Sequence, residues 1–144
     1  MTPARSAIAL VALLVGACSN ELYREDIDGS EADVPASYRN LQNPYRDNVD
    51  AATVGQILYD ARCVSCHGDT GRGDGPQGVG MVPPPTDFVA ASLPTEGYLF
   101  WKIREGGEPV GSEMPAYRGQ LEDGQIWEIV SYLRLFYEEE PLYR

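Results

Sequence analysis

The segment from Cys63 to His67, with the sequence CVSCH, constrains this chain more than any other. It brings together two of the three cysteines and the only histidine of a 144-residue protein. Thiols and an imidazole this close together can form a disulfide, exchange electrons, bind a metal ion or hold a prosthetic group. The rest of the sequence decides among these kinds of chemistry.

A structural zinc site and a thioredoxin-like redox pair both fit poorly. Structural zinc takes four ligands that are usually Cys or His, whereas this chain has one histidine and its third cysteine, Cys18, lies far away near the N-terminus. A thioredoxin-like pair occurs at a helix start within a βαβ unit. Here Cys63 and Cys66 follow a predicted helix, and no alternating strand pattern is found.

The glycine-rich segment after His67 formally contains GxGxxG at residues 73–78. No strand precedes it, Pro76 lies inside it, and three prolines at 83–85 follow where a phosphate-binding helix would begin. The tripeptide Arg-Gly-Asp at residues 72–74 is too short to indicate cell adhesion. We interpret the whole segment as a solvated loop.

Covalent haem attachment remains, for which Cys-x-x-Cys-His is the recognised pattern. Two thiols separated by two residues, Cys63 and Cys66, can reach the two vinyl groups of one macrocycle and form thioethers. His67 then stands where its imidazole can bind the iron. We therefore expect one covalent haem c.

The second axial ligand cannot be another histidine of this chain, since His67 is the only one. It must be a methionine, a lysine, a terminal amine or a water at an open position. We favour Met114, which lies between two predicted helices and is followed by the stiffening Pro115. Met81 is the alternative, but it follows His67 closely, within the loop that must first wrap the near side of the haem.

The N-terminus indicates export. Residues 1–17 contain Arg5 and an apolar run too short to cross a bilayer, which takes about 20 helical residues. The segment Leu-Val-Gly-Ala-Cys at 14–18 resembles the lipobox of bacterial lipoproteins. That resemblance implies a signal peptide over 1–17, acylation of Cys18, and a lipid anchor on the extracytoplasmic, periplasmic face of a bacterial membrane.

The remaining chain divides into two parts. Residues 18–49 are acidic, interrupted by Pro35 and Pro44 and without apolar periodicity, so we expect an acylated N-terminus and a flexible tether. Residues 50–144 form the predicted domain. The formal net charge is −11 and Lys and Arg do not cluster, which excludes nucleic acid as a partner.

Helical periodicity predicts three main helices in this domain. The first begins near Asp50 and ends at the cysteines, with an apolar face formed by Val54, Ile57, Leu58 and Ala61. The second runs from the N-cap Thr95 to the two glycines at 106–107, with Leu99 and Ile103 one turn apart. The last carries the strongest apolar stripe: Ile126, Ile129, Val130, Leu133 and Phe136 or Tyr137.

With these features assembled, residues 50–137 resemble a class I c-type cytochrome. Gly55 and Tyr59 precede Cys63 as the family's glycine and aromatic residue do on its N-terminal helix, and residues 129–133 resemble the matching C-terminal helix. The resemblance implies an all-α cytochrome c fold, in which three main helices and long loops surround one covalently bound haem. It also implies that the two helices cross with Gly55 against Ile129 or Tyr132.

The site residues that the resemblance implies are Cys63, Cys66, His67 and Met114, since Met114-Pro115 is similar to the family's distal ligand motif. In the family a proline carbonyl accepts the imidazole N–H, so one of the prolines at 83–85 is expected in that role. Candidates for contacts with the haem propionates are Arg72, Trp101, Lys102, Arg104 and Arg118.

The segments GxGDGP, PPPxDF and MPAYxGQL are similar to those of monohaem lipoprotein cytochromes attached to respiratory membrane complexes, including the monohaem subunit of alternative complex III. We therefore expect an electron carrier and not an enzyme, either mobile or a subunit of a membrane respiratory complex, with redox proteins as partners and no small-molecule substrate. The alternative is a peroxidase-like haem enzyme or a gas sensor with an open sixth coordination position.

Overall fold

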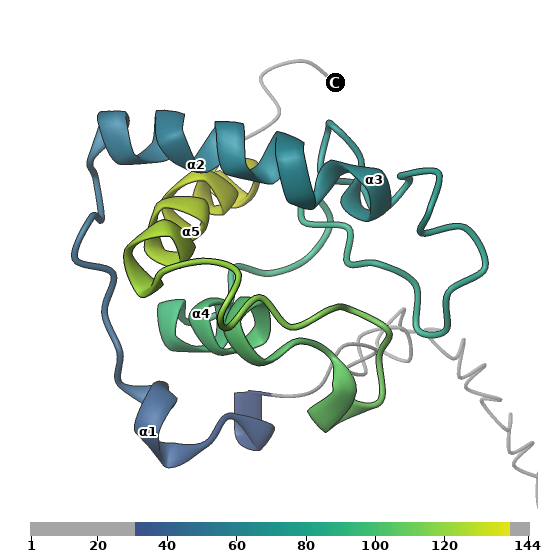
Figure 1. Cartoon of the computed structure of the whole chain (residues 1–144), viewed down its shortest axis with the longest axis horizontal. Coiled ribbons are helices and arrows are strands. Elements are labelled where there is room, and N and C mark those ends of the chain that lie inside the picture. Colours follow the sequence, from purple (N-terminus) through teal and green to yellow (C-terminus); the bar gives the residue numbers. More distant parts are fainter. Residues whose placement is uncertain (1–30, 139–144) are drawn as a thin grey trace, which may run out of the picture.

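The computed structural model describes residues 31–138 (Figure 1). Its main helices are α2 (Val49–Arg62), α4 (Glu96–Glu105) and α5 (Asp123–Glu138), as the sequence predicts. The shorter elements are η2 (Glu31–Asp33), α1 (Ala36–Arg39), α3 (Val64–His67) and η3 (Glu108–Val110). Over the described range the chain forms no strand, only an isolated bridge between Arg118 and Leu121. The all-α architecture is confirmed.

The helix starts follow from local side-chain chemistry. Asn48 caps α2 by accepting a hydrogen bond from the Ala51 N–H at 3.1 Å, and Thr95 caps α4 by accepting from the Tyr98 N–H at 3.3 Å. These side chains satisfy backbone donors that lack a partner in the first helical turn. At the start of α5 the Gln125 side chain accepts from the Glu122 N–H at 2.9 Å, which is the side-chain-to-cap half of a capping box.

The core is built mainly by α4 and α5, and α2 crosses over α5 at one side of it (Figure 1). A Cβ added at Gly55 would overlap the Glu128 carbonyl oxygen and lie 3.0 Å from the Tyr132 Cβ, so only glycine permits this approach. Tyr59, one turn further along α2, is 1% exposed and packs edge-on against Tyr132. The expected contact of Gly55 with Tyr132 is present, and Glu128 takes the place expected for Ile129.

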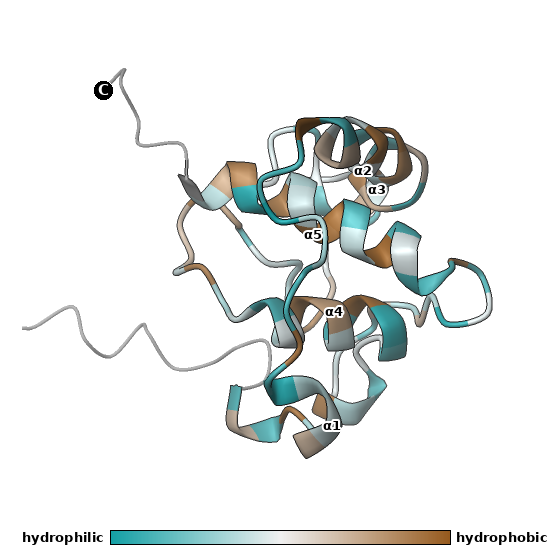
Figure 2. Cartoon of the chain, turned by 90° about the vertical axis from the view of Figure 1, so that its left-hand side faces the viewer, coloured by the Kyte–Doolittle hydropathy of each residue, from teal (hydrophilic) through white to brown (hydrophobic). Residues whose placement is uncertain are grey.

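The predicted apolar face of α2 is wrong for Val54, Ile57 and Ala61, whereas Leu58 is partly buried against the core. The buried residues of the helix are Ala51, Gly55 and Tyr59, whereas Val54 is 40% exposed and Ile57 is 64% exposed. Hydrophobic residues therefore lie on the outward side of α2 (Figure 2). The helix buries the face that permits the closest approach to α5, where Ala51 and Gly55 are small and Tyr59 packs against α5. The predicted stripes of α4 and α5 are buried: Leu99, Ile103, Ile126, Ile129, Val130 and Leu133.

The segment from residue 31 to residue 48, here named the N-terminal strap, differs from the expected flexible tether. It begins with η2, continues through α1 and packs against α4 before entering α2 (Figure 1). Val34 in the strap is 1% exposed and belongs to the core. The strap makes single, non-periodic contacts, and a search for apolar periodicity cannot detect such contacts.

Asn43 holds the strap to the last helix. Its side-chain amide donates to the Trp127 carbonyl oxygen at 3.1 Å and to the Ser131 hydroxyl at 2.9 Å, and its own side-chain oxygen accepts from the Tyr45 N–H. The Asn43 N–H donates to the buried carboxylate of Glu96 at 2.8 Å. These groups satisfy one another in a site shielded from water.

Glu96 lies at the centre of a second set of strap contacts. Its carboxylate pairs with Arg46 of the strap at 2.9 Å and with Arg134 of α5 at 3.4 Å. The Glu96 side chain is only 5% exposed, and burying a carboxylate requires such partners. Residues 18–30 of the expected tether, and the predicted signal peptide with Cys18, lie outside the described residues. None of the helices between residues 31 and 138 has the length and apolar character needed to cross a membrane.

Replacing Gly55 by alanine tests the close helix crossing. The added methyl group forces α2 away from α5, and overpacking of this kind destabilises by about 1–3 kcal/mol, although alanine by itself favours a helix by about 1 kcal/mol over glycine. We expect a net loss of stability in urea denaturation. The exposed neighbour Gln56→Ala is the control and changes little. A stabilised Gly55→Ala protein would contradict the crossing.

Replacing Asn43 by alanine tests the strap. The variant leaves the Trp127 carbonyl and the Ser131 hydroxyl without their buried donor, which costs about 2 kcal/mol. Urea denaturation measures the loss. Gln42→Ala removes an exposed amide that bonds only to the neighbouring Leu41 carbonyl, and serves as the matched control. Equal stability of the two variants would show that the strap does not pack as described.

Candidate functional site

Cys63, Cys66 and His67 share one face of a single helical turn. Cys63 ends α2 and begins α3, and its carbonyl oxygen accepts from the N–H groups of Cys66 at 3.1 Å and of His67 at 2.9 Å. Positions three and four apart on a helix lie on the same side. The local fold of CVSCH therefore aims both thiols and the imidazole into one space.

The glycine-rich loop after His67 closes the end of this turn. The N–H groups of Gly73, Gly75 and Gln77 donate to the carbonyl oxygens of His67, Cys66 and Ser65 at 2.9, 3.0 and 2.8 Å. The backbone donors that a nucleotide-binding loop would offer to phosphate are therefore used to cap α3. This supports our rejection of the GxGxxG interpretation.

The His67 ring is held on two sides. Its Nδ1 lies 3.5 Å from the Thr86 carbonyl oxygen, and its face stacks on Phe88 with the ring centroids 4.8 Å apart. Donation from Nδ1–H to this carbonyl leaves Nε2 available as a metal ligand. The structure corrects the expectation that a proline carbonyl accepts the imidazole N–H. The acceptor is Thr86, directly after Pro85, and the carbonyl oxygen of Pro85 lies against Gly73.

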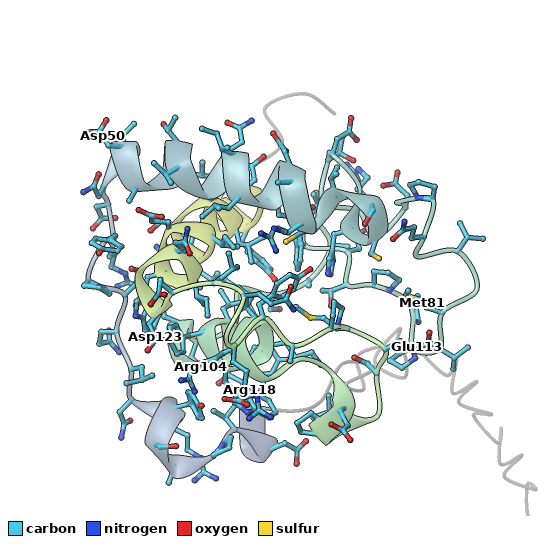
Figure 3. The ribbon with its side chains drawn as sticks, in the orientation of Figure 1. Asp50, Met81, Arg104, Glu113, Arg118 and Asp123 are labelled. Carbon is cyan, nitrogen blue, oxygen red and sulfur yellow. The ribbon has the colours of Figure 1, made fainter. Side chains whose placement is uncertain are left out.

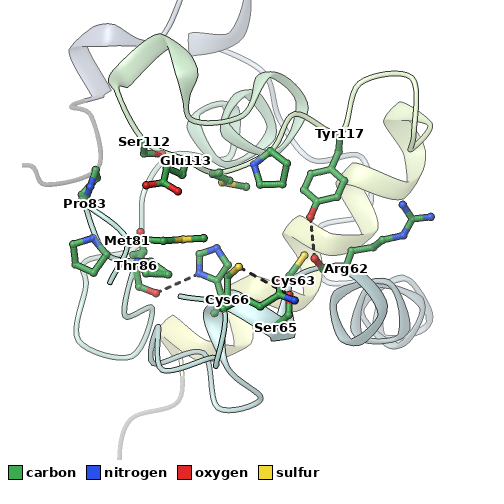
Figure 4. A pocket seen from close by; sticks show the side chains of 16 residues that line it. Arg62, Cys63, Ser65, Cys66, Met81, Pro83, Thr86, Ser112, Glu113 and Tyr117 are labelled. Carbon is green, nitrogen blue, oxygen red and sulfur yellow. Dashed lines mark hydrogen bonds between the residues drawn. The ribbon is translucent and has the colours of Figure 1, made fainter. Parts of the chain in front are cut away.

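These groups open into a cavity of about 410 Å³, within the usual size range of cofactor sites. Its lining includes Cys63, Cys66 and His67 together with Met114, Pro115 and Tyr117 from the loop before α5. Figure 4 shows Cys63 and Cys66 on one side of the cavity and Ser112 and Glu113 on the other. The remaining lining includes the following residues of the loop after α3: Gln77, Met81, Pro83, Pro84, Pro85 and Thr86.

The cavity suits a covalently bound haem c. Cys63 and Cys66 are both free thiols, although a Cys-x-x-Cys pair can also close a disulfide. Burial raises the pKa of the Cys63 thiol to about 12, with a smaller contribution from Cys66. An apolar, enclosed position of this kind fits a sulfur that ends in a neutral thioether. Between residues 31 and 138 no three His, Cys, Asp or Glu side chains are grouped so that they could hold a metal ion.

Both candidate methionines line the cavity, so the structure brings Met81 as well as Met114 to the site. The two methionines differ in how closely the surrounding chain packs around them. The Met114 carbonyl oxygen accepts from the Gly107 N–H at 2.8 Å, and the backbone around it lies within 3 Å of a Cβ placed at Gly106. Met81 lies between Val79 and Val82, which are 81% and 80% exposed.

The residues expected to meet the propionates do not line the cavity. Trp101 and Lys102 are buried within α4, while Arg104 and Arg118 bind Glu105. Figure 3 shows these two arginines well away from Met81 and Glu113, which border the cavity. Arg72 is exposed and is also absent from the lining.

Sequence reasoning missed several lining residues, of which Arg62 and Tyr117 are linked by a hydrogen bond. Arg62 contributes the cationic side chain of the cavity lining, and its carbonyl oxygen accepts from the Tyr117 hydroxyl at 2.9 Å (Figure 4). Burial, and to a lesser degree the nearby Cys63, raises the pKa of Tyr117 to about 12, so the phenol stays a donor. Arg62 could have been found from the sequence because it directly precedes Cys63. No local pattern indicates that Tyr117 borders the cavity.

Comparisons with known proteins bear on this site. Residues 50–133 match the family described as cytochrome c oxidase, cbb3-type, subunit III. The cbb3-type cytochrome c oxidase subunit FixP of Bradyrhizobium diazoefficiens is 33% identical over 109 residues. That alignment covers 74% of this chain and 35% of FixP, so the chain spans about a third of the length of this relative.

Two solved structures share the fold. A chain of the reducing HAO-like protein complex of Kuenenia stuttgartiensis superposes with a TM-score of 0.57 and 24% identity, over 65% of this chain and 46% of that one. Cytochrome cL of Methylophaga aminisulfidivorans superposes with a TM-score of 0.51 and 23% identity, over 67% and 61%. The chain therefore belongs to the cbb3-type subunit III family of cytochrome c domains, which bind haem c covalently and transfer electrons.

Proposed function

We propose that this protein is a lipid-anchored extracytoplasmic electron carrier whose single haem c has His67 and Met114 as axial ligands. The observation that carries the proposal is the shared cavity, in which two free thiols and the imidazole face a wall bearing a thioether. Haem c supplies one-electron redox chemistry when bound. Methionine opposite histidine favours the reduced iron and so raises the reduction potential.

The chain's own residues prepare the site for electron transfer. Thr86 and Phe88 fix the orientation of the His67 ring, which keeps Nε2 directed toward its ligand position. The hydrogen bond from the Gly107 N–H to the Met114 carbonyl oxygen holds the backbone at Met114 before any ligand is bound. Fixed ligands lower the structural change that accompanies a change of charge, and this favours rapid electron exchange. We favour Met114 over Met81 for this reason.

Replacing Met114 by alanine tests the ligation. The unmodified ferric protein is expected to be low-spin, and its reduced form to resist carbon monoxide. Met114→Ala is expected to become high-spin, to bind carbon monoxide readily and to have a lower reduction potential. Visible spectra with and without carbon monoxide measure the first two effects, and a redox titration measures the third.

Met81→Ala is the matched control, since it removes the same side chain from another part of the cavity lining. It is expected to stay low-spin. Loss of the low-spin spectrum in Met81→Ala alone would transfer the ligand role to Met81. A high-spin unmodified protein that binds carbon monoxide would instead favour the open-site haem enzyme or gas sensor.

The anchor and the partner are further parts of the proposal. The lipobox-like sequence ending at Cys18 supports acylation, and the similarity to FixP, a subunit of an oxidase, supports association with a respiratory complex. The net charge of −11 suits partners with basic docking surfaces. No proton-handling group or substrate pocket is needed for this role, so the chain is proposed not to be an enzyme.

Replacing Cys18 by alanine tests the anchor. The unmodified protein is expected in the membrane fraction, and in mild detergent it is expected to co-elute with a respiratory complex. Cys18→Ala is expected in the soluble extracytoplasmic fraction with its haem spectrum unchanged, because the substitution removes the acylated residue and leaves the domain intact. Ser19→Ala is the control. Persistent membrane binding of Cys18→Ala, with the haem intact, would contradict acylation.

A further inference from the structure

Glu105, the last residue of α4, joins three parts of the molecule. Its carboxylate accepts from the Tyr38 hydroxyl of the N-terminal strap at 2.7 Å. It also accepts from Arg104 of its own helix and from Arg118, both at 2.9 Å. Arg118 lies between α4 and α5, in the stretch of residues 107–121 that carries Met114 and is here named the Met114 loop.

The Met114 loop is bound to the end of α4 by backbone hydrogen bonds. The N–H groups of Tyr117 and Arg118 donate to the carbonyl oxygens of Ile103 and Arg104 at 3.1 and 2.9 Å, and within the loop the Gly107 N–H donates to the Met114 carbonyl oxygen at 2.8 Å. Gly106 has a φ of +77° and passes so close to the loop that a Cβ there would lie 2.7 Å from the Ala116 nitrogen. The position of Met114 therefore depends on how the end of α4 is held.

Tyr38 is well suited to hold the end of α4. Its hydroxyl donates to Glu105 and accepts from Arg104 at 3.0 Å, so one phenol completes a network with both charges. Burial and the bond to Glu105 raise the pKa of Tyr38, so the phenol remains a donor at neutral pH. Glu105 is 16% exposed in its side chain, and bonds in such a shielded place are stronger than on an open surface.

Tyr38 lies before the residues that match the family. The family match covers residues 50–133 and therefore excludes Tyr38, whereas it includes Glu105 and Met114. A bond from the N-terminal strap thus acts on the helix end that supports the ligand loop.

We propose that Tyr38 is a positioning residue for the axial ligand Met114, acting through Glu105 and the Met114 loop. This inference rests on the proposed ligation of the haem by Met114. The strap then fixes the loop in the conformation in which the thioether faces the cavity, and loosening the strap at Tyr38 weakens the hold on the ligand without removing it. Carbon monoxide competes with Met114 for the same coordination position, so its affinity measures how firmly Met114 is held there.

Carbon monoxide affinity of the reduced, full-length haem protein is the test. Tyr38→Phe keeps the ring in place and removes only the hydroxyl, so we expect carbon monoxide to bind on the order of fivefold more tightly than to the unmodified protein. Glu105→Gln is expected to act in the same direction, because the amide loses its charge-assisted bonds to the two arginines. Neither variant is expected to reach the affinity of Met114→Ala.

Two controls separate positioning from general loosening. Tyr45→Phe removes a hydroxyl from the same strap away from Glu105, and Arg46→Gln breaks the ion pair with Glu96 at the other end of the strap. Both are expected to leave carbon monoxide affinity within about twofold, and Arg46→Gln is expected to lower the unfolding midpoint. If Tyr38→Phe matches these controls while Met114→Ala binds carbon monoxide tightly, the positioning role is overturned and the ligation stands. If Met114→Ala has no effect, both are overturned.

Discussion

The close crossing of α2 and α5 governs the geometry of the site. Gly55 lets the two helices approach, and Tyr59 then packs between Tyr132 and Phe136 of α5. The Tyr59 hydroxyl donates to the carbonyl oxygen of Gly68 at 2.6 Å, directly after His67. The crossing therefore sets both the direction of α2 and the end of the turn that carries the thiols and the imidazole.

The histidine side of the cavity depends on the same helix pair. Phe88 stacks on His67 and also packs against Phe136 and Tyr137 near the end of α5. Ligand orientation on this side thus comes from aromatic packing, with Thr86 supplying the acceptor for Nδ1. The methionine side is built differently, from backbone bonds between the end of α4 and the loop that follows it, with the strap fastened to that helix end.

Much of the fold and of the site could be predicted from local sequence. The Cys-x-x-Cys-His spacing alone predicts the site at Cys63 to His67. Caps and apolar periodicity predict α4 and α5. The buried face of α2 could not be predicted in this way, because Val54 and Ile57 lie outward and a glycine faces the partner helix. The strap escaped detection because its contacts, such as those of Asn43, join residues far apart in the chain.

The sequence by itself determined the chemistry: two thiols, one imidazole and a choice between two thioethers, because these are properties of residue type and spacing. Only the tertiary structure decided which carbonyl faces His67, that Tyr117 and Arg62 border the cavity, and that residues 31–48 belong to the folded domain. Such contacts join segments separated by many residues, and their formation depends on helix packing that no local pattern encodes.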